Sequence, residues 1–275
     1  MASTYVLGRD YKSASRLNYE HYLWKETIAF SLHPNIVLTT NNSTGASEGN
    51  QCALIADVAC GTAIWLRDVA QTFPNAQLDG FDISLAQCPP AKWLPRNVTL
   101  RQWDLFSEPP AELLGRYDVV HVRLVFVVVE NDDPRPLIRS LSRLLRPGGY
   151  LQWDELNVGK SFILSAEEVT ETPEMAGMLG ILGRMGSWVE ELPRMMEDCG
   201  LVEGKLYRYR EREELARAFF DNHLAKDEEM AQTALKGTKE GEQLVERVRK
   251  MYEESKGGAV LCTPKLVSIA RKPQR

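Results

Sequence analysis

The most informative segment of this sequence is residues 55–63, which read IADVACGTA. An apolar run ends in Asp57, a loop of small residues follows, and the segment after the loop has the pattern of an amphipathic helix. Ala59 and Gly61 have little or no side chain, so a ligand can approach the backbone of such a loop closely. A second apolar segment, 78–83, contains Asp82 near its end. In doubly wound α/β folds an acid at the tip of the second strand binds ribose hydroxyls, so the sequence predicts a nucleoside-cofactor site.

Apolar and amphipathic patterns alternate along most of the chain. This alternation predicts an α/β fold, a doubly wound, Rossmann-like sheet of six or seven strands. Ligands of such sheets bind beyond the carboxyl ends of the strands, so residues at strand ends are the functional candidates. Strands are expected at 53–58, 77–82, 98–103, 118–122, 150–154, 201–209 and 265–270.

Local signals also predict helices and loops. We expect an N-terminal helix over 13–32 and a polar loop over 39–50. Asp132 or Asp133 can cap a later helix with Pro134 in its first turn, which Pro147-Gly148-Gly149 ends. The pattern loosens over 157–190, a helix follows near 190–199, and 211–255 is charged and helical. Three parts are expected, namely an N-terminal helical cap and linker (1–50), a cofactor-binding half (51–156), and the remainder of the sheet (157–275) with cap insertions at 157–190 and 211–256.

Charge and composition exclude several functions. The net charge is −5 and no basic run occurs, which argues against a nucleic-acid partner. No run approaches the ~18 apolar residues of a membrane span. The five cysteines are scattered, without CxxC or Cys/His metal spacing, which indicates free thiols in a reducing compartment and no metal site. We expect a cytoplasmic monomer or homodimer that acts on a small molecule.

The loop itself discriminates between cofactors. A dinucleotide loop reads G-x-G-x-x-G, whereas residues 57–63 contain a single glycine and begin with an acid that would repel pyrophosphate. A nicotinamide-dependent reductase is therefore a weak alternative. The loop resembles the D-x-G-C-G-T-G loop of class I S-adenosylmethionine-dependent methyltransferases, with Ala59 and Ala63 in place of two of its glycines.

The resemblance extends beyond the loop. Residues 87–95 (QCPPAKWLP), 117–123 (YDVVHVR) and 145–155 (LRPGGYLQWDE) look like a fungal group of methyltransferases of secondary metabolism. That group includes enzymes that N- or S-methylate gliotoxin-type epidithiodiketopiperazines and, more distantly, LaeA-like regulators, and it accepts the alanine-bearing loop. The similarity covers roughly 5–155 and 190–272. It implies a class I methyltransferase sheet with an N-terminal helix and helical cap insertions, and S-adenosyl-L-methionine as the cofactor.

The resemblance also implies roles for individual residues. Gly61 and its neighbours would bracket the methionine part of the cofactor, with Asp57 near its amino group. Asp82 would take both ribose hydroxyls, and Asp104 would accept from the adenine amino group. The cofactor residues expected in this way are Asp57, Ala59, Gly61, Thr62, Asp82, Ile83, Trp103, Asp104, Leu105, His121 and Arg123, with Trp103 or Leu105 against the adenine ring and His121 and Arg123 beside the methionine.

Catalysis is expected to rest on proximity. None of the four histidines stands in an evident His–Asp pair in the sequence, so no dedicated base is predicted. This favours a thiol or an amine as acceptor, because a thiol of pKa about 8.5 needs only about 2 kcal/mol to ionise at neutral pH. His121, Asp154 and Glu155 are the candidates for assisting deprotonation.

The acceptor is expected to bind between the N-terminal helix and the segment 175–188. Methionine side chains suit a hydrophobic guest of variable shape. Trp24 is expected in the core. Tyr19, Tyr22, Met178, Met185 and Trp188 are the predicted substrate residues.

Our first hypothesis is S-methylation of a small, largely apolar (di)thiol of the epidithiodiketopiperazine type. N- or O-methylation of another natural product is the alternative, and so is an S-adenosylmethionine-binding regulator or a non-methylating, pericyclic enzyme.

Overall fold

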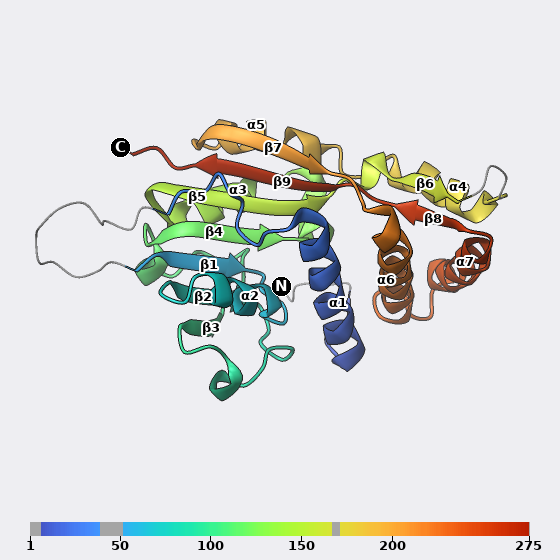
Figure 1. Cartoon of the computed structure of the whole chain (residues 1–275), viewed down its shortest axis with the longest axis horizontal. Coiled ribbons are helices and arrows are strands. Elements are labelled where there is room, and N and C mark those ends of the chain that lie inside the picture. Colours follow the sequence, from blue (N-terminus) through green and yellow to red (C-terminus); the bar gives the residue numbers. More distant parts are fainter. Residues whose placement is uncertain (1–6, 39–51, 167–170, 275) are drawn as a thin grey trace, which may run out of the picture.

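A seven-stranded sheet forms the centre of the molecule (Figure 1). The computed structural model describes residues 7–38, 52–166 and 171–274, so the expected loop at 39–50 lies outside the described residues. The strand order is β3-β2-β1-β4-β5-β9-β7. The first five strands of this order run parallel, and β9 is antiparallel to both β5 and β7. The strands are β1 (Leu54–Val58), β2 (Gln77–Asp82), β3 (Val98–Gln102), β4 (Tyr117–Arg123), β5 (Leu145–Leu156), β7 (Val202–Tyr209) and β9 (Lys265–Arg271).

Helices cover both faces of this sheet. Side chains of a strand alternate between faces, so Ile55 and Ala56 of β1 enter different hydrophobic clusters. One cluster joins the sheet to α3 (Arg135–Leu144) and α5 (Trp188–Asp198), and the other joins it to α1 (Tyr11–Ile28) and α2 (Ile64–Thr72). Short 3₁₀ helices occur at Ala91–Trp93, Ala111–Leu113, Phe126–Val128, Glu130–Asp132 and Val158–Lys160.

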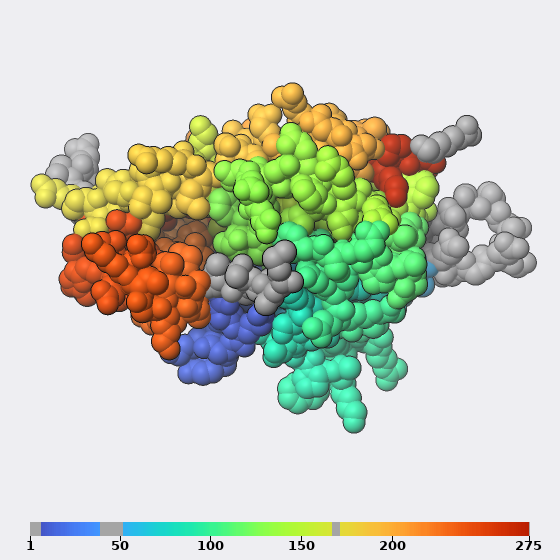
Figure 2. Space-filling model, turned by 180° about the vertical axis from the view of Figure 1, so that it is seen from behind, coloured from blue at the N-terminus to red at the C-terminus, as the bar shows by residue number. Residues whose placement is uncertain are grey.

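A second, smaller unit packs at one end of the sheet. Strands β6 (Phe162–Ser165) and β8 (Ala259–Cys262) form an antiparallel pair. Helices α4 (Pro173–Leu182), α6 (Glu213–Gln232) and α7 (Lys239–Lys256) pack with this pair in a third hydrophobic cluster. Figure 1 shows α1 between the main sheet and α6, and Figure 2 shows α6, α7 and α4 at one end of the molecule, in orange and yellow.

The expected α/β architecture is confirmed, with differences at the boundaries of elements. The first helix ends at Ile28 rather than at residue 32, because Ala29 takes a left-handed conformation with φ 63°. Pro134 is the N-cap of α3, and the Asp133 carboxylate accepts from the N–H of Arg135. The helix ends at Leu144, ahead of the Pro147-Gly148-Gly149 segment expected to end it.

Two expectations were incomplete. Strand β5 runs over Leu145–Leu156 instead of 150–154. The region 157–190 contains β6 and α4, and β8 was not expected at all. The strands β6 and β8 are four residues long and pair across about a hundred positions of sequence, so no local pattern indicates either of them.

Candidate functional site

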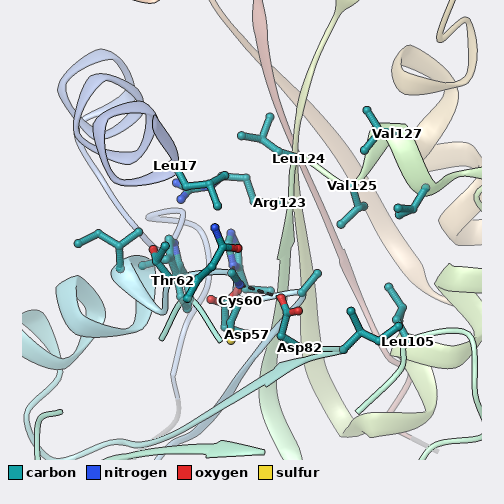
Figure 3. Close-up of a pocket in the computed structure, with 18 of the residues that line it drawn as sticks. Leu17, Asp57, Cys60, Thr62, Asp82, Leu105, Arg123, Leu124, Val125 and Val127 are labelled. Carbon is teal, nitrogen blue, oxygen red and sulfur yellow. Dashed lines mark hydrogen bonds and ion pairs between the residues drawn. The ribbon is translucent and has the colours of Figure 1, made fainter. Parts of the chain in front are cut away.

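A pocket opens at the carboxyl ends of β1, β2 and β4, where the strand order reverses (Figure 3). It encloses about 1140 Å³, including the part open to solvent. This is the edge at which doubly wound sheets bind ligands. All eleven predicted cofactor residues line it: Asp57, Ala59, Gly61, Thr62, Asp82, Ile83, Trp103, Asp104, Leu105, His121 and Arg123.

The loop between β1 and α2 repeats a left-handed backbone conformation. Ala59, Gly61 and Ala63 have φ angles of 58°, 55° and 60°. Glycine adopts this conformation freely, whereas alanine pays roughly 1–2 kcal/mol for it. The loop thus needs a left-handed backbone conformation at three alternate positions, and Ala59 and Ala63 adopt this conformation with strain. Strain of this kind is typical of ligand-binding loops.

The carboxylate of Asp82 connects this loop to the end of β2. One oxygen accepts from the N–H of Gly61 at 2.9 Å and the other accepts from the N–H of Ser84 at 3.0 Å. Each carboxylate oxygen has two lone pairs, so each can accept one further hydrogen bond from a ligand. Burial and the nearby charge of Asp57 raise the pKa of Asp82, against the opposing effect of these N–H groups and of Arg9.

A second acid lies at the end of β3. The Asp104 carboxylate accepts from the N–H of Phe106 at 3.0 Å and lines the pocket together with Trp103 and Leu105. The indole N–H of Trp103 is buried and has no hydrogen-bond partner among the described residues. An acid and two large apolar side chains at one end of the pocket fit a planar heterocycle with an exocyclic amine.

His121 joins two buried carboxylates. Its Nδ1 lies 2.7 Å from Asp57 Oδ1 and its Nε2 lies 3.4 Å from Asp154 Oδ2. The indole of Trp65 stacks on the imidazole at 3.8 Å between ring centroids. Burial alone would lower the pKa of His121, but the hydrogen bonds to Asp154 and Asp57 raise it above its ordinary value. With a carboxylate oxygen near each ring nitrogen, His121 has no free nitrogen with which to take up a proton.

No His–Asp pair is evident in the sequence, but the structure forms one around His121. Asp57, His121 and Asp154 come from β1, β4 and β5, which are neighbours in the sheet but distant in sequence. In the parallel register His121 lies beside Asp57 on one side and beside Gln152 on the other, with Asp154 two positions further along β5. Only the strand order brings these three side chains together.

Two predicted bases do not face the pocket. Asp154 and Glu155 are each 1% exposed and neither lines the pocket, so neither carboxylate faces an acceptor bound there, and their assistance in deprotonation stays a prediction. The Glu155 carboxylate accepts from the N–H of Leu156 at 3.0 Å and lies 3.5 Å from the indole N–H of Trp153. Burial raises the pKa of Glu155 to about 8.

Arg123 connects the pocket to α1. Its Nη2 donates to Nδ1 of His21 at 3.1 Å, and its guanidinium carbon lies 5.8 Å from the ring centroid of Trp24. Burial and the Arg123 charge lower the pKa of His21 to about 3, so His21 is a neutral acceptor. As expected, Trp24 is a core residue, 1% exposed. Helix α1 contributes Leu17 and Glu20 to the pocket wall.

The predicted substrate residues lie elsewhere, and none of them lines this pocket. Tyr19 and Tyr22 are 46% and 50% exposed, and the Tyr22 hydroxyl accepts from Arg67. Met178 is buried in the cluster of the smaller unit, Met185 is largely exposed, and Trp188 is buried in the main core. Residues that share a helix with a pocket residue can face away from it, which a sequence pattern does not reveal.

The wall opposite α1 was missed. Leu124, Val125, Val127 and Val128 line the pocket directly after β4, where Figure 3 shows Leu124, Val125 and Val127 above the acids. The sequence signal was the apolar run 124–129 immediately after a predicted strand end. The other lining residues not predicted are Arg9, Leu17, Glu20, Cys60, Ile64, Trp65, Gln87 and Phe106.

Within the part of the chain that the structure describes, no helix is both long and apolar enough to cross a membrane.

Comparison with known proteins shows what this chain is similar to. Residues 56–151 match a family described as a methyltransferase domain. The chain is 32% identical over 159 residues to the N-methyltransferase verN of Clonostachys rogersoniana, a match that covers 58% of this chain and 52% of that protein. It is 37% identical over 105 residues to the secondary metabolism regulator LAE1 of Hypocrea atroviridis, covering 38% of this chain and 29% of the relative. The chain thus matches about half or less of the length of these relatives.

A solved structure shows the same fold. The complex between the Haloferax volcanii Trm112 methyltransferase activator and the putative methyltransferase contains a chain that superposes with a TM-score of 0.53 at 16% identity, over 96% of this chain and 95% of that one. The match at this identity concerns the fold alone. The protein has a doubly wound, Rossmann-like fold, and its residues 56–151 are similar to a methyltransferase domain.

Proposed function

We propose that this protein transfers a methyl group from S-adenosylmethionine to a small, largely apolar metabolite. One observation carries the proposal. Eleven residues predicted as cofactor ligands from the sequence line one pocket at the point where the strand order reverses. Their convergence at this edge, from the ends of β1, β2, β3 and β4, supports a cofactor site there.

The donor and acceptor groups of the pocket fit this cofactor. Asp82 has a free lone pair on each oxygen for two ribose hydroxyls. Asp104, with Trp103 and Leu105, fits adenine. The glycine-like loop 59–63 lets the methionine part approach the backbone, and Asp57 supplies a negative charge for its ammonium group.

The residues of the chain align the reactants and exclude water. The bound cofactor supplies an electrophilic methyl group on a sulfonium centre. Alignment of an acceptor with this group can contribute about 7–11 kcal/mol without any protein base. Leu17 on one side and Val125 and Val127 on the other form an apolar enclosure for the acceptor (Figure 3).

For the accepting atom we propose nitrogen or sulfur. Both nitrogens of His121 are engaged by carboxylates, so this histidine is not available to deprotonate an alcohol or a phenol. An amine needs only to be neutral, and a thiol ionises near neutral pH. The relative verN is named an N-methyltransferase, which supports nitrogen. A (di)thiol of the epidithiodiketopiperazine type is the second candidate, supported by the absence of any need for a strong base.

The test separates binding from transfer. Calorimetry with S-adenosylmethionine measures cofactor binding, and methyl-labelled cofactor with a panel of amines, thiols and phenols measures transfer. We expect binding and labelled product with an amine or a thiol. Binding without transfer to any acceptor would favour a regulatory role like that for which LAE1 is named. Absence of binding would refute the cofactor site.

A further inference from the structure

Arg123 brings a positive charge to the pocket that no carboxylate of the described residues neutralises. It is the last residue of β4, and its side chain lines the pocket (Figure 3). Its guanidinium contacts Nδ1 of His21 at 3.1 Å and lies 5.8 Å from the ring centroid of Trp24, but forms no ion pair within the described part of the chain. Arginine stays protonated in proteins, so the charge remains available to a ligand.

The carboxylates of the pocket have other partners. Asp57 contacts His121 at 2.7 Å, and Glu20 lies 3.4 Å from Arg16. The two remaining acids are those proposed to bind ribose and adenine. A positive charge at the wall of a pocket, without a carboxylate from the protein, favours an anionic group on the ligand.

His21 holds the guanidinium of Arg123 from the side of α1. Its imidazole is 1% exposed, and Nδ1 accepts a hydrogen bond from Arg123 Nη2. A ring nitrogen that accepts carries no proton, so this imidazole is neutral, with its proton on Nε2. Nε2 lies 4.0 Å from Oδ2 of Asp68, a carboxylate that also accepts from Lys25 and Ser31. A neutral acceptor orients the guanidinium, whereas a carboxylate in the place of His21 would cancel its charge.

The guanidinium is held near the loop 59–63. In the register of β1 and β4, His121 lies beside Asp57, so Arg123 lies beyond the end of β1, on the same face of the sheet as His121. Helix α1 contacts this loop as well, because the Thr62 hydroxyl donates to Asn18 Oδ1 at 2.6 Å. The proposed function assigns this loop to the methionine part of the cofactor, next to which the acceptor must bind.

We propose that His21 is a positioning residue that holds Arg123 as the carboxylate-binding group of this pocket. A guanidinium binds a carboxylate through two parallel N–H groups, provided that its plane is fixed. The carboxylate has two sources, the methionine part of the cofactor and the acceptor. If the acceptor is the source, the substrate is an amino or thiol acid with an otherwise apolar body. The inference rests on the proposed function, whose site it extends.

The experiment compares five variants of the full chain. Arg123→Gln removes the charge, and Arg123→Lys keeps the charge without the planar pair of N–H groups. His21→Leu removes the acceptor nitrogen, and His21→Asn supplies an amide oxygen in its place. Arg67→Gln is the matched control, because Arg67 also donates to a residue of α1, Tyr22, but does not line the pocket.

The readouts compare ligands with and without a carboxylate. Calorimetry gives the Kd for S-adenosylmethionine and for decarboxylated S-adenosylmethionine, which lacks only this group. Steady-state kinetics give KM for pairs of amines or thiols that differ by one carboxylate, and circular dichroism melting reports folding.

The two sources of the carboxylate give different results in Arg123→Gln. If the cofactor is the source, the Kd for S-adenosylmethionine rises roughly tenfold or more, and that for the decarboxylated cofactor stays within about threefold. If the acceptor is the source, both Kd values stay within about threefold, and KM rises roughly tenfold or more only for the acceptor with the carboxylate. His21→Leu should give the same selective loss, His21→Asn and Arg123→Lys a smaller one, and Arg67→Gln none.

The outcomes separate this inference from the proposed function. Equal changes for ligands with and without the carboxylate in Arg123→Gln, or no change for either, would overturn it. A loss in His21→Leu that does not depend on the carboxylate, or that His21→Asn does not reduce, would overturn the role of His21. If His21→Leu does not fold, Arg123→Gln and His21→Asn decide, and an unchanged preference for the carboxylate in Arg123→Gln overturns the inference. If the wild type binds cofactor but transfers no methyl group, the proposed function fails, and the two Kd values alone decide the inference.

Discussion

Replacement of Asp82 by alanine tests the cofactor site most directly. In the structure each oxygen of this carboxylate already accepts one backbone N–H, at 2.9 and 3.0 Å, and has one lone pair left for a ribose hydroxyl. A hydrogen bond to a charged group contributes about 1.5–3 kcal/mol. Since about 1.4 kcal/mol corresponds to a factor of ten in Kd, we expect Asp82→Ala to weaken S-adenosylmethionine binding by roughly 10- to 150-fold.

A second effect of Asp82→Ala, on the loop 59–63, favours the upper end of the expected loss of cofactor affinity. Asp82→Ala also removes the acceptor of the Gly61 N–H and thereby loosens the loop that faces the cofactor. Asp82→Asn keeps one acceptor oxygen and should lose less affinity. The assay is calorimetry on each variant, with circular dichroism melting to confirm folding. Asp133→Ala, a change beside the N-cap of α3 and outside the pocket, is the control. A folded Asp82→Ala protein with affinity within about threefold of wild type would refute the ribose assignment.

Three further predictions follow from buried or strained groups. Because the pKa of Glu155 rises from 4.5 to about 8 on folding, its stabilising contribution is complete below pH 4.5 and is lost as the pH rises through 8. The free energy of unfolding of the wild type, measured with urea relative to that of Glu155→Gln, should fall by up to about 1.4 kcal/mol per pH unit in this window. A difference between the two proteins that stays constant with pH would contradict the raised pKa of Glu155. His121→Phe leaves Asp57 and Asp154 buried without a cation and should lower the free energy of unfolding by about 3–5 kcal/mol. A decrease below about 1 kcal/mol would mean that the cluster of His121 and the two acids is not charged. Ala59→Gly should leave thermal stability nearly unchanged, because relief of the left-handed strain offsets the added entropy of the unfolded chain. The β-branched Ala59→Val should lower the free energy of unfolding by about 1–3 kcal/mol. Equal melting temperatures of the two variants would argue against strain at this position.

The cofactor half of the site was predictable because its signals are local. Asp57 and Asp82 each end an apolar strand of their own, and parallel strands place their carboxyl ends on one edge of the sheet. The small residues of the loop 59–63 stand at alternate positions, and the structure gives them matching left-handed φ angles. Residues within one strand–loop–helix unit keep their relative positions whatever the rest of the fold does.

The acceptor half was not predictable, because it depends on which side of an element faces the pocket. On α1 the pocket takes Leu17 and Glu20, and the predicted Tyr19 and Tyr22 lie on the exposed side. Trp188 is a large aromatic residue that was predicted to contact the substrate, but it is buried in the main hydrophobic core. Periodicity shows that a helix has a buried stripe but not whether that stripe meets a cavity or another helix.

The sequence by itself determined the doubly wound sheet, the position of the cofactor edge and eleven of the residues that line it, since alternation of strands and helices and the residues at strand ends are properties of short segments. Only the tertiary structure decided that His121 contacts Asp57 on one side and Asp154 on the other. Both depend on strand order and register. Each pairs side chains that are more than twenty residues apart in the chain, and such pairs form only when the whole sheet has folded.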